Sequence, residues 1–125
     1  MQVKIVTPSA PPAGTSPHSQ AIATDNLIFT QGSIYLTPEG KLLEGTVAEQ
    51  VDQIMKNLSA ILKAAGVTFA NIVKTTIYVT DLSIYGTVNE IYKKYMVEPY
   101  LARETVCVRE LSLGAKVEIS MIAVK

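Results

Sequence analysis

Residues 46–66 read TVAEQVDQIMKNLSAILKAAG, and this stretch carries the clearest structural signal of the chain. Its apolar side chains recur at the spacing of three and four residues that places them on one face of an α-helix. They are Val51, Ile54, Met55, Leu58, Ile61, Leu62 and Ala65. Thr46 and Glu49 have the spacing of a capping box, and Gly66 is a favoured residue at a helix end. The stretch therefore predicts one long amphipathic helix.

Runs rich in β-branched and aromatic residues precede this helix. Residues 3–6 and 26–35 predict strands, and Gly32 inside the second run predicts a bulge or a close approach of another group to the backbone. Between the two runs, residues 7–17 are rich in proline and predict an irregular loop. Residues 37–40, TPEG, predict a turn that leads toward the helix.

The chain after the helix predicts a strand, a second helix and two more strands. Residues 71–80, NIVKTTIYVT, alternate in polarity as a strand does, and Asp81 or Ser83 can then cap a helix. The apolar stripe of this second helix consists of Ile84, Val88, Ile91, Tyr92 and Tyr95. Residues 105–110 and 116–124 predict the last two strands.

This order of elements is typical of an α+β fold, with a mixed sheet and two helices on one face. A length of 125 residues predicts a single domain over residues 1–125. The second face of the strand at 116–124 carries Glu118 and Ser120 but also Ile122 and Val124. No predicted helix remains to cover this partly apolar face. We therefore expect it to be buried against other subunits in a closed symmetric oligomer.

Composition and charge disfavour several classes of function. The 11 lysine and arginine residues balance the 11 aspartate and glutamate residues, so no net charge attracts nucleic acid. A single cysteine, Cys107, cannot form an internal disulfide, and the chain shows neither a signal peptide nor an apolar run of the roughly 20 residues that span a bilayer. We expect a soluble, cytoplasmic protein without membrane or nucleic-acid partners. One histidine and no nucleotide-binding motif predict no metal and no cofactor.

Seven segments, spread over most of the chain, carry a resemblance to a known family. They are SPHSQAI (16–22), TQGSI (30–34), EQVDQIMKNLSAILKAAG (49–66), NIVKTTIYVTDL (71–82), VNEIYKKYM (88–96), LARETV (101–106) and KVEISMIAV (116–124). In this order the chain resembles the RidA family of reactive intermediate deaminases, also called the YjgF or perchloric-acid-soluble protein family. The resemblance implies a chorismate-mutase-like fold, a closed homotrimer and a site in each cleft between neighbouring subunits. It also implies hydrolysis of 2-imino and 2-enamino acids, such as 2-aminoacrylate and 2-iminobutanoate, to 2-oxo acids and ammonia.

Two residues carry the chemistry that the resemblance implies. The family arginine that binds the substrate carboxylate corresponds to Arg103, whose planar guanidinium can form two parallel hydrogen bonds with a carboxylate. Without the resemblance, a surface ion pair with Glu98 or Glu104 is the commoner role for such an arginine. The glutamate that holds or activates the attacking water corresponds to Glu118, which can act as a general base. Taken alone, such a glutamate is more often a solvated strand residue.

Three further residues follow from the resemblance. Gly32 matches the glycine whose amide approaches the substrate carboxylate, because the lack of a side chain permits that approach. Thr105 lies where relatives offer backbone groups to the substrate. Asn89 matches a helix asparagine that is better suited to fixing local hydrogen bonds than to contacting substrate.

The chain departs from the family at three positions. His18 replaces the tyrosine of a Gly-Pro-Tyr segment, and its imidazole can still donate a hydrogen bond. Gln31 stands where relatives often have serine, and Leu101 replaces a common proline. We count His18 and Gln31 among the predicted substrate-binding residues. The departures affect substrate range more than reaction type, because Arg103 and Glu118 both remain.

Two other functions stay open at this point. The family is also described as an endoribonuclease or translation inhibitor, a function that needs a basic groove with stacking aromatic residues, and the sequence shows no such pattern. A non-catalytic trimer that binds small 2-oxo acids would need Arg103 but not Glu118. The preferred imino acid and the enzyme that supplies it are not predicted.

Overall fold

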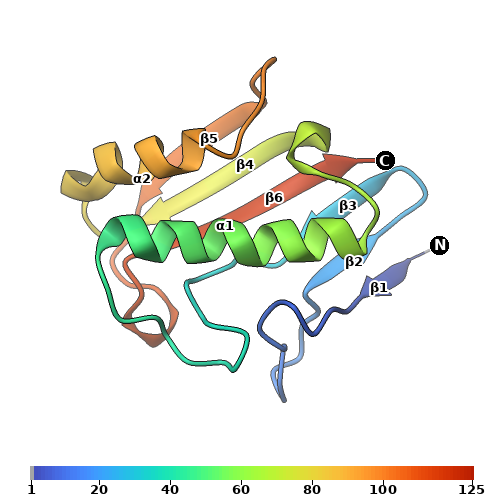
Figure 1. The fold of residues 1–125 in the computed structure, drawn as a ribbon, viewed down its shortest axis with the longest axis horizontal. Helices are drawn as coiled ribbons and strands as arrows, with labels where there is room; N and C mark the ends of the chain where they lie inside the picture. The colour runs from blue at the N-terminus through green and yellow to red at the C-terminus, as the bar shows by residue number, and fades with distance from the viewer. Residues whose placement is uncertain (1) are drawn as a thin grey trace.

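The structure, a computed structural model, describes residues 2–125. Within this part of the chain, a six-stranded mixed sheet has two α-helices on one side (Figure 1). The strands are β1 (Val3–Ile5), β2 (Ala21–Ala23), β3 (Leu27–Thr30), β4 (Ile72–Val79), β5 (Ala102–Cys107) and β6 (Val117–Val124), in the spatial order β1-β2-β3-β6-β4-β5. The helices are α1 (Val47–Ala64) and α2 (Tyr85–Lys93), with 3₁₀ helices η1 (Phe69–Asn71), η2 (Leu82–Ile84) and η3 (Ser112–Gly114) in the connections. The predicted mixed sheet with two helices is confirmed, whereas the chorismate-mutase-like arrangement and the trimer stay predictions.

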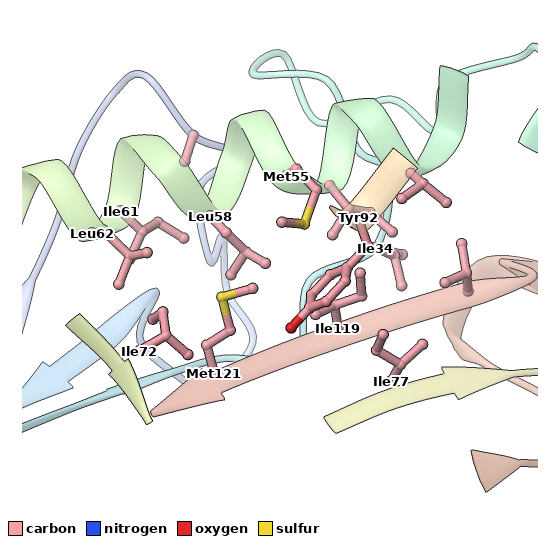
Figure 2. Packing of buried hydrophobic residues seen from close by; sticks show 14 of the residues in the cluster. Ile34, Met55, Leu58, Ile61, Leu62, Ile72, Ile77, Tyr92, Ile119 and Met121 are labelled. Carbon is pink, nitrogen blue, oxygen red and sulfur yellow. The ribbon is translucent and has the colours of Figure 1, made fainter. Parts of the chain in front are cut away.

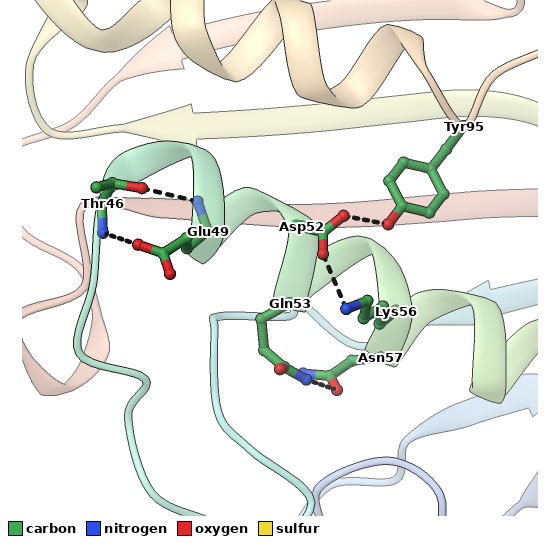
Figure 3. Close-up of polar contacts among 7 residues, drawn as sticks. All are labelled: Thr46, Glu49, Asp52, Gln53, Lys56, Asn57 and Tyr95. Carbon is green, nitrogen blue, oxygen red and sulfur yellow. Dashed lines mark hydrogen bonds and ion pairs between the residues drawn. The ribbon is translucent and has the colours of Figure 1, made fainter.

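Helix α1 begins and ends close to where its sequence predicts. Thr46 and Glu49 form the predicted capping box: each side chain accepts a hydrogen bond from the backbone N–H of the other residue (Figure 3). Gly66 follows the helix with φ of +83°, a left-handed conformation that glycine adopts without strain. Farther along α1, Asp52 accepts a hydrogen bond from the Tyr95 hydroxyl (Figure 3). Tyr95 lies just after α2, not inside it as predicted, and links that segment to α1.

The core lies between α1 and the sheet. Strand β6 is central and runs antiparallel to both of its neighbours, β3 and β4. Figure 2 shows Leu58, Ile61 and Leu62 of α1 on the side of the helix that faces the sheet, where Ile119 and Met121 project from β6. All five side chains are at most 1% exposed. Because burial of one such side chain stabilises a fold by about 1.5–3 kcal/mol, this layer holds α1 against the sheet.

Helix α2 covers the same side of the sheet over β4. The buried Tyr92 of α2 donates a hydrogen bond of 3.1 Å from its hydroxyl to Thr75 of β4. The predicted cap Asp81 accepts a hydrogen bond from the Ser83 backbone, but it caps η2, which comes before α2. No helix within residues 2–125 has both the length and the apolar character needed to cross a membrane.

Strands β5, β2 and β3 differ most from the sequence prediction. Strand β5 covers residues 102–107 and not 105–110, because it pairs in parallel with residues 74–79 of β4. Strand β2 is not predicted, since it has only three residues and two are alanines. Strand β3 ends at Thr30, and the chain rejoins the sheet at Ser33 through a single bridge to Ile119. Where these strands begin and end depends on the strand that each one pairs with. The local sequence pattern does not reveal that partner.

One face of the sheet has no helix over it within residues 2–125. By alternation, β6 turns Glu118 and Ile122 to this uncovered face. Phe29 lies opposite Ile122, and Val106 lies in the row that contains Glu118, and these two apolar side chains are 40% and 39% exposed. For residues 2–125, the prediction that no helix covers this partly apolar face is therefore confirmed.

Candidate functional site

Arg103 lies on the edge strand β5, and α2 holds its side chain. In the parallel register Arg103 is the partner of Thr75, which is buried beneath the helices, so both side chains are on the helix-covered side. Arg103 Nη1 donates to Asn89 Oδ1 at 2.6 Å, and its Nη2 donates to the Tyr85 hydroxyl at 2.7 Å. Tyr85 and Asn89 are four residues apart, so consecutive turns of α2 present both acceptors to one guanidinium.

No carboxylate neutralises Arg103 within residues 2–125. Both of its hydrogen-bond acceptors are neutral, and Glu104, a possible ion-pair partner from sequence, binds Lys74 at 2.9 Å. The rings of Tyr85 and Tyr92 have their centres 5.7 and 5.3 Å from the guanidinium carbon, within the range of cation–π contacts. Because a guanidinium has five N–H donors, several remain for an anionic ligand.

A cavity of about 310 Å³ adjoins this arginine. Its lining includes Arg103, Asn89, Tyr92 and Leu101, so the departure at Leu101 faces the cavity. Thr105 follows on the same side of β5, and its buried hydroxyl has no hydrogen-bond partner among the described residues. Arg103, Asn89 and Thr105 thus form one set of polar residues, which we call the Arg103 group.

Glu118 lies on the uncovered side of the sheet. Its side chain is half-buried, and this burial raises the pKa of the Glu118 carboxyl above the ordinary value of 4.5. A raised pKa makes a carboxylate a better base near neutral pH. A β-carbon at residue 32 would collide with the carboxylate, so the contact requires Gly32. The close approach predicted at Gly32 is confirmed, and the group that approaches is Glu118.

His18 and Gln31 lie in the same region as Glu118. With Gly32 they line two cavities of about 220 and 570 Å³, and Glu118 borders both. His18 is exposed and follows the proline-rich loop, which is irregular as predicted. These four predicted site residues, Glu118, Gly32, Gln31 and His18, form a second set, which we call the Glu118 group.

One chain does not bring the two groups together. Arg103 is on the helix-covered face of the sheet, and Glu118 is on the opposite face. A side chain on one face cannot reach a ligand bound on the other, because the backbone of the sheet lies between them. Any site that uses both residues therefore needs more than one chain.

Residues 7–125 match the family described as endoribonuclease L-PSP. The chain belongs to the endoribonuclease L-PSP family. Relatives of this chain carry the Rid name of the family that the seven segments resemble. One is the chloroplastic Reactive Intermediate Deaminase A of Arabidopsis thaliana, which is 46% identical over 121 residues. That match covers 96% of this chain, and the chain spans 65% of the length of the Arabidopsis protein.

Two more relatives are similar over nearly their whole length. A 2-iminobutanoate/2-iminopropanoate deaminase of Mus musculus is 44% identical over 123 residues, with 98% of this chain and 91% of the mouse protein covered. A solved structure of a protein of the conserved Rid family from Yersinia pestis has a TM-score of 0.93 and 38% identity, with 100% of both chains covered. The fold of this chain is thus the fold of L-PSP family members.

Two tyrosines that contact Arg103 in this L-PSP family member escape prediction as site residues. Tyr85, Asn89 and Tyr92 have the i, i+4, i+7 spacing of one helix face, which is a usable signal. The same spacing is typical of core packing, and Tyr92 is indeed buried. Without the position of Arg103, a row of site residues cannot be told from a row of core residues.

The two groups of this L-PSP family member offer anion binding and proton transfer. Within residues 2–125, no three His, Cys, Asp or Glu side chains gather in a way that could hold a metal ion. Arg103 can bind a small carboxylate, and Glu118 can accept and return a proton. Together the two residues can hold a small acid and activate a water molecule beside it.

Proposed function

We propose that this chain hydrolyses reactive 2-imino and 2-enamino acids to 2-oxo acids and ammonia. The enzyme class, a hydrolytic deaminase, follows from relatives such as the mouse and Arabidopsis proteins, which are named deaminases. The observation that carries the proposed substrate class is the state of Arg103, whose guanidinium is fixed by two neutral acceptors and has no carboxylate partner within residues 2–125. Such a group is ready to bind the carboxylate of a small acid through charge-assisted hydrogen bonds.

Glu118 supplies the proton transfers in this mechanism. It takes a proton from water while the water oxygen bonds to C2 of the imine, and it returns that proton to the imine nitrogen. It then takes the hydroxyl proton of the resulting carbinolamine and passes it to the nitrogen as the C2–N bond breaks. The products are the 2-oxo acid and ammonia, and the carboxylate ends as it began. Water is the only co-reactant, so no cofactor enters the scheme.

The site of this mechanism is shared between subunits. The Arg103 group of one subunit faces the Glu118 group of the next, because the two groups lie on opposite faces of one chain. The partly apolar uncovered face supports burial against other copies of the chain. We place one domain per chain, residues 1–125, in a closed homotrimer with the chorismate-mutase-like arrangement. A cytoplasmic location stays a prediction, and the Arabidopsis relative is named chloroplastic.

RNA cleavage, which the family description names, has less support. The chain has equal numbers of basic and acidic residues, and a groove for RNA normally combines excess positive charge with stacked aromatic rings. A non-catalytic binding trimer is the closer competitor, because it would use the Arg103 group alone. A measurement of turnover separates the two, because the binding trimer would not hydrolyse the imine and the deaminase would.

The proposed function is tested by supplying 2-iminobutanoate to the purified protein. A dehydratase or an amino-acid oxidase generates the imine in the assay, and release of 2-oxobutanoate is compared with the spontaneous rate. We expect faster release, and the same rate after dialysis against EDTA. Release at the spontaneous rate would contradict the deaminase, and binding of 2-oxobutanoate without turnover would identify the binding trimer.

A further inference from the structure

The smaller of the two cavities beside Glu118 extends behind Gly32 toward α1. Its volume is about 220 Å³, and its walls include Glu118, Gly32, Ser33 and Asn57. Ser33 and Asn57 are 4% and 2% exposed. We call this space the Ser33 cavity. It connects the carboxylate on the uncovered face with buried polar side chains on the helix-covered side.

Ser33 is held in place by its backbone but not by its side chain. Its N–H donates to the Ile119 carbonyl at 2.8 Å, and its carbonyl accepts from the Ile119 N–H at 3.0 Å. Residues opposite each other in an antiparallel bridge point to the same side, so the Ser33 side chain points toward α1, as Ile119 does. The Ser33 hydroxyl is buried and has no hydrogen-bond partner among the described residues.

Asn57 of α1 closes the other side of the cavity in a fixed orientation. Its Nδ2 donates to the Leu36 carbonyl at 2.7 Å, and its Oδ1 accepts from Gln53 Nε2 at 2.9 Å (Figure 3). The Asn57 amide nitrogen and the Asn57 amide oxygen thus each have one hydrogen bond to the protein. The Ser33 hydroxyl still lacks a partner, although buried hydroxyls in native proteins are nearly always paired.

A cavity of this size has room for water. One water molecule needs only about 15 Å³ of such space, together with two or more polar partners. Ser33, Asn57 and Glu118 all line this one space, and each carries a polar group. His18, Gln31 and Gly32 line the same cavity, so it adjoins the Glu118 group directly.

We infer that the Ser33 cavity stores the hydrolytic water, and that Ser33 is a positioning residue that orders this water for delivery to Glu118. This inference rests on the proposed function. In the proposed step, a stored water gives its oxygen to C2 of the imine and one proton to Glu118, and Ser33 acts only through the hydrogen bonds of the water. Water then reaches the bound imine without passing the carboxylate clamp, which lies in the Arg103 group.

Two variants of equal shape test the role of the hydroxyl. Ser33→Thr keeps the hydroxyl, and Ser33→Val replaces it with a methyl group of similar size, so both variants change packing equally. We expect Ser33→Thr to retain turnover of 2-iminobutanoate and Ser33→Val to lose about tenfold, as for one lost hydrogen bond in a reactive state. Affinity for 2-oxobutanoate should be the same in both variants, because the Arg103 group is intact.

A second readout separates an ordered water from a purely structural role. Loss of ordered water leaves the Glu118 carboxylate less solvated, so the acidic limb of the rate profile should move to higher pH in Ser33→Val but not in Ser33→Thr. Should both variants unfold, Ser33→Ala takes the place of valine and is compared with the unchanged chain. Equal turnover and equal profiles with and without the hydroxyl overturn the inference. If the unchanged chain shows no turnover, the proposed function itself has failed, and the inference falls with it.

Discussion

At the scale of single residues, we propose that Arg103 binds the carboxylate of the substrate. Replacement by lysine keeps the charge but removes the planar fork that suits a carboxylate. We expect Arg103→Lys to weaken binding of 2-oxobutanoate by about 2 kcal/mol, roughly 30-fold, when measured by titration calorimetry. Arg109→Lys, a change at an exposed arginine, is the matched control and should bind normally. Unchanged affinity of Arg103→Lys for 2-oxobutanoate would refute the proposal that Arg103 binds the carboxylate.

We propose a different role for Glu118, that of the base, so the loss of its carboxylate should separate binding from turnover. Glu118→Gln keeps the size of the side chain but removes the base, and we expect turnover to fall by roughly 10²–10⁴-fold with binding of 2-oxobutanoate intact. Burial raises the pKa of Glu118, which means that the folded chain disfavours its charge. The variant should therefore melt no earlier than the unchanged chain. Wild-type turnover in Glu118→Gln, with exposed Glu110→Gln as control, would refute the role of the base.

The raised pKa of Glu118 also predicts a pH profile. The base works when ionised, so enzymatic turnover is present above the pKa of Glu118 and is lost as the pH falls through it. Burial places this acidic limb above the pH expected for an ordinary glutamate with a pKa of 4.5. His18 lines the same cavities and Tyr78 lies opposite on β4, so the profile is also measured in His18→Gln. A limb at or below pH 4.5, after subtraction of spontaneous hydrolysis, would contradict this assignment.

Prediction from sequence succeeds for residues whose role depends on local chemistry. Thr46 and Glu49 form the capping box that their spacing indicates, and Gly32 has the close neighbour that a glycine inside a strand suggests. Tyr85 and Ser33 escape prediction for different reasons. The contact of Tyr85 depends on where β5 places Arg103, and the missing partner of Ser33 is visible only when the whole cavity is formed.

At the scale of elements, α1 is the main support of the sheet that carries Glu118. Leu58 is fully buried on the face of α1 that packs on β6 (Figure 2). We expect Leu58→Ala to lower the free energy of unfolding by about 2–5 kcal/mol in urea titrations, because it leaves a cavity in the core. The exposed neighbour in Ser59→Ala should change stability by no more than about 0.5 kcal/mol. A loss below about 1 kcal/mol in Leu58→Ala would show that α1 does not hold the core together.

Elements differ in how far their own residues specify them. Helix α1 has a complete local signal, with a cap, a periodic apolar face and a glycine stop, and its predicted limits agree with the structure. Strand β5 is exposed at the sheet edge, and its sequence lacks a clear alternation of polar and apolar residues. Its limits therefore come from pairing with β4. Long periodic elements are therefore predictable from sequence, and short edge strands depend on tertiary contacts.

At the scale of the whole molecule, the two groups of polar residues act together in the proposed mechanism but lie on opposite faces of one sheet. The sequence pattern predicts an uncovered face, and the structure confirms it within residues 2–125. The identity of the covering partner does not follow from one chain. A closed ring of identical subunits is the arrangement that pairs every Arg103 group with a Glu118 group and leaves none unmatched.

Complementation between subunits tests this shared site most directly. Arg103→Ala and Glu118→Gln subunits are co-expressed in equal amounts, and turnover of 2-iminobutanoate is compared with that of the unchanged protein. A shared site is intact wherever the Glu118→Gln subunit supplies Arg103 and its Arg103→Ala neighbour supplies Glu118, which random mixing gives at about a quarter of the sites.

A second mixture, of unchanged subunits with subunits that carry both substitutions, provides the control for this measurement. A shared site again leaves about a quarter of the sites intact, so the two mixtures should be equally active. A site within one chain would leave the first mixture inactive and about half of the sites in the second mixture intact. Equal activity of the two mixtures is the result that we predict, and an inactive first mixture beside a half-active second mixture would contradict the shared site.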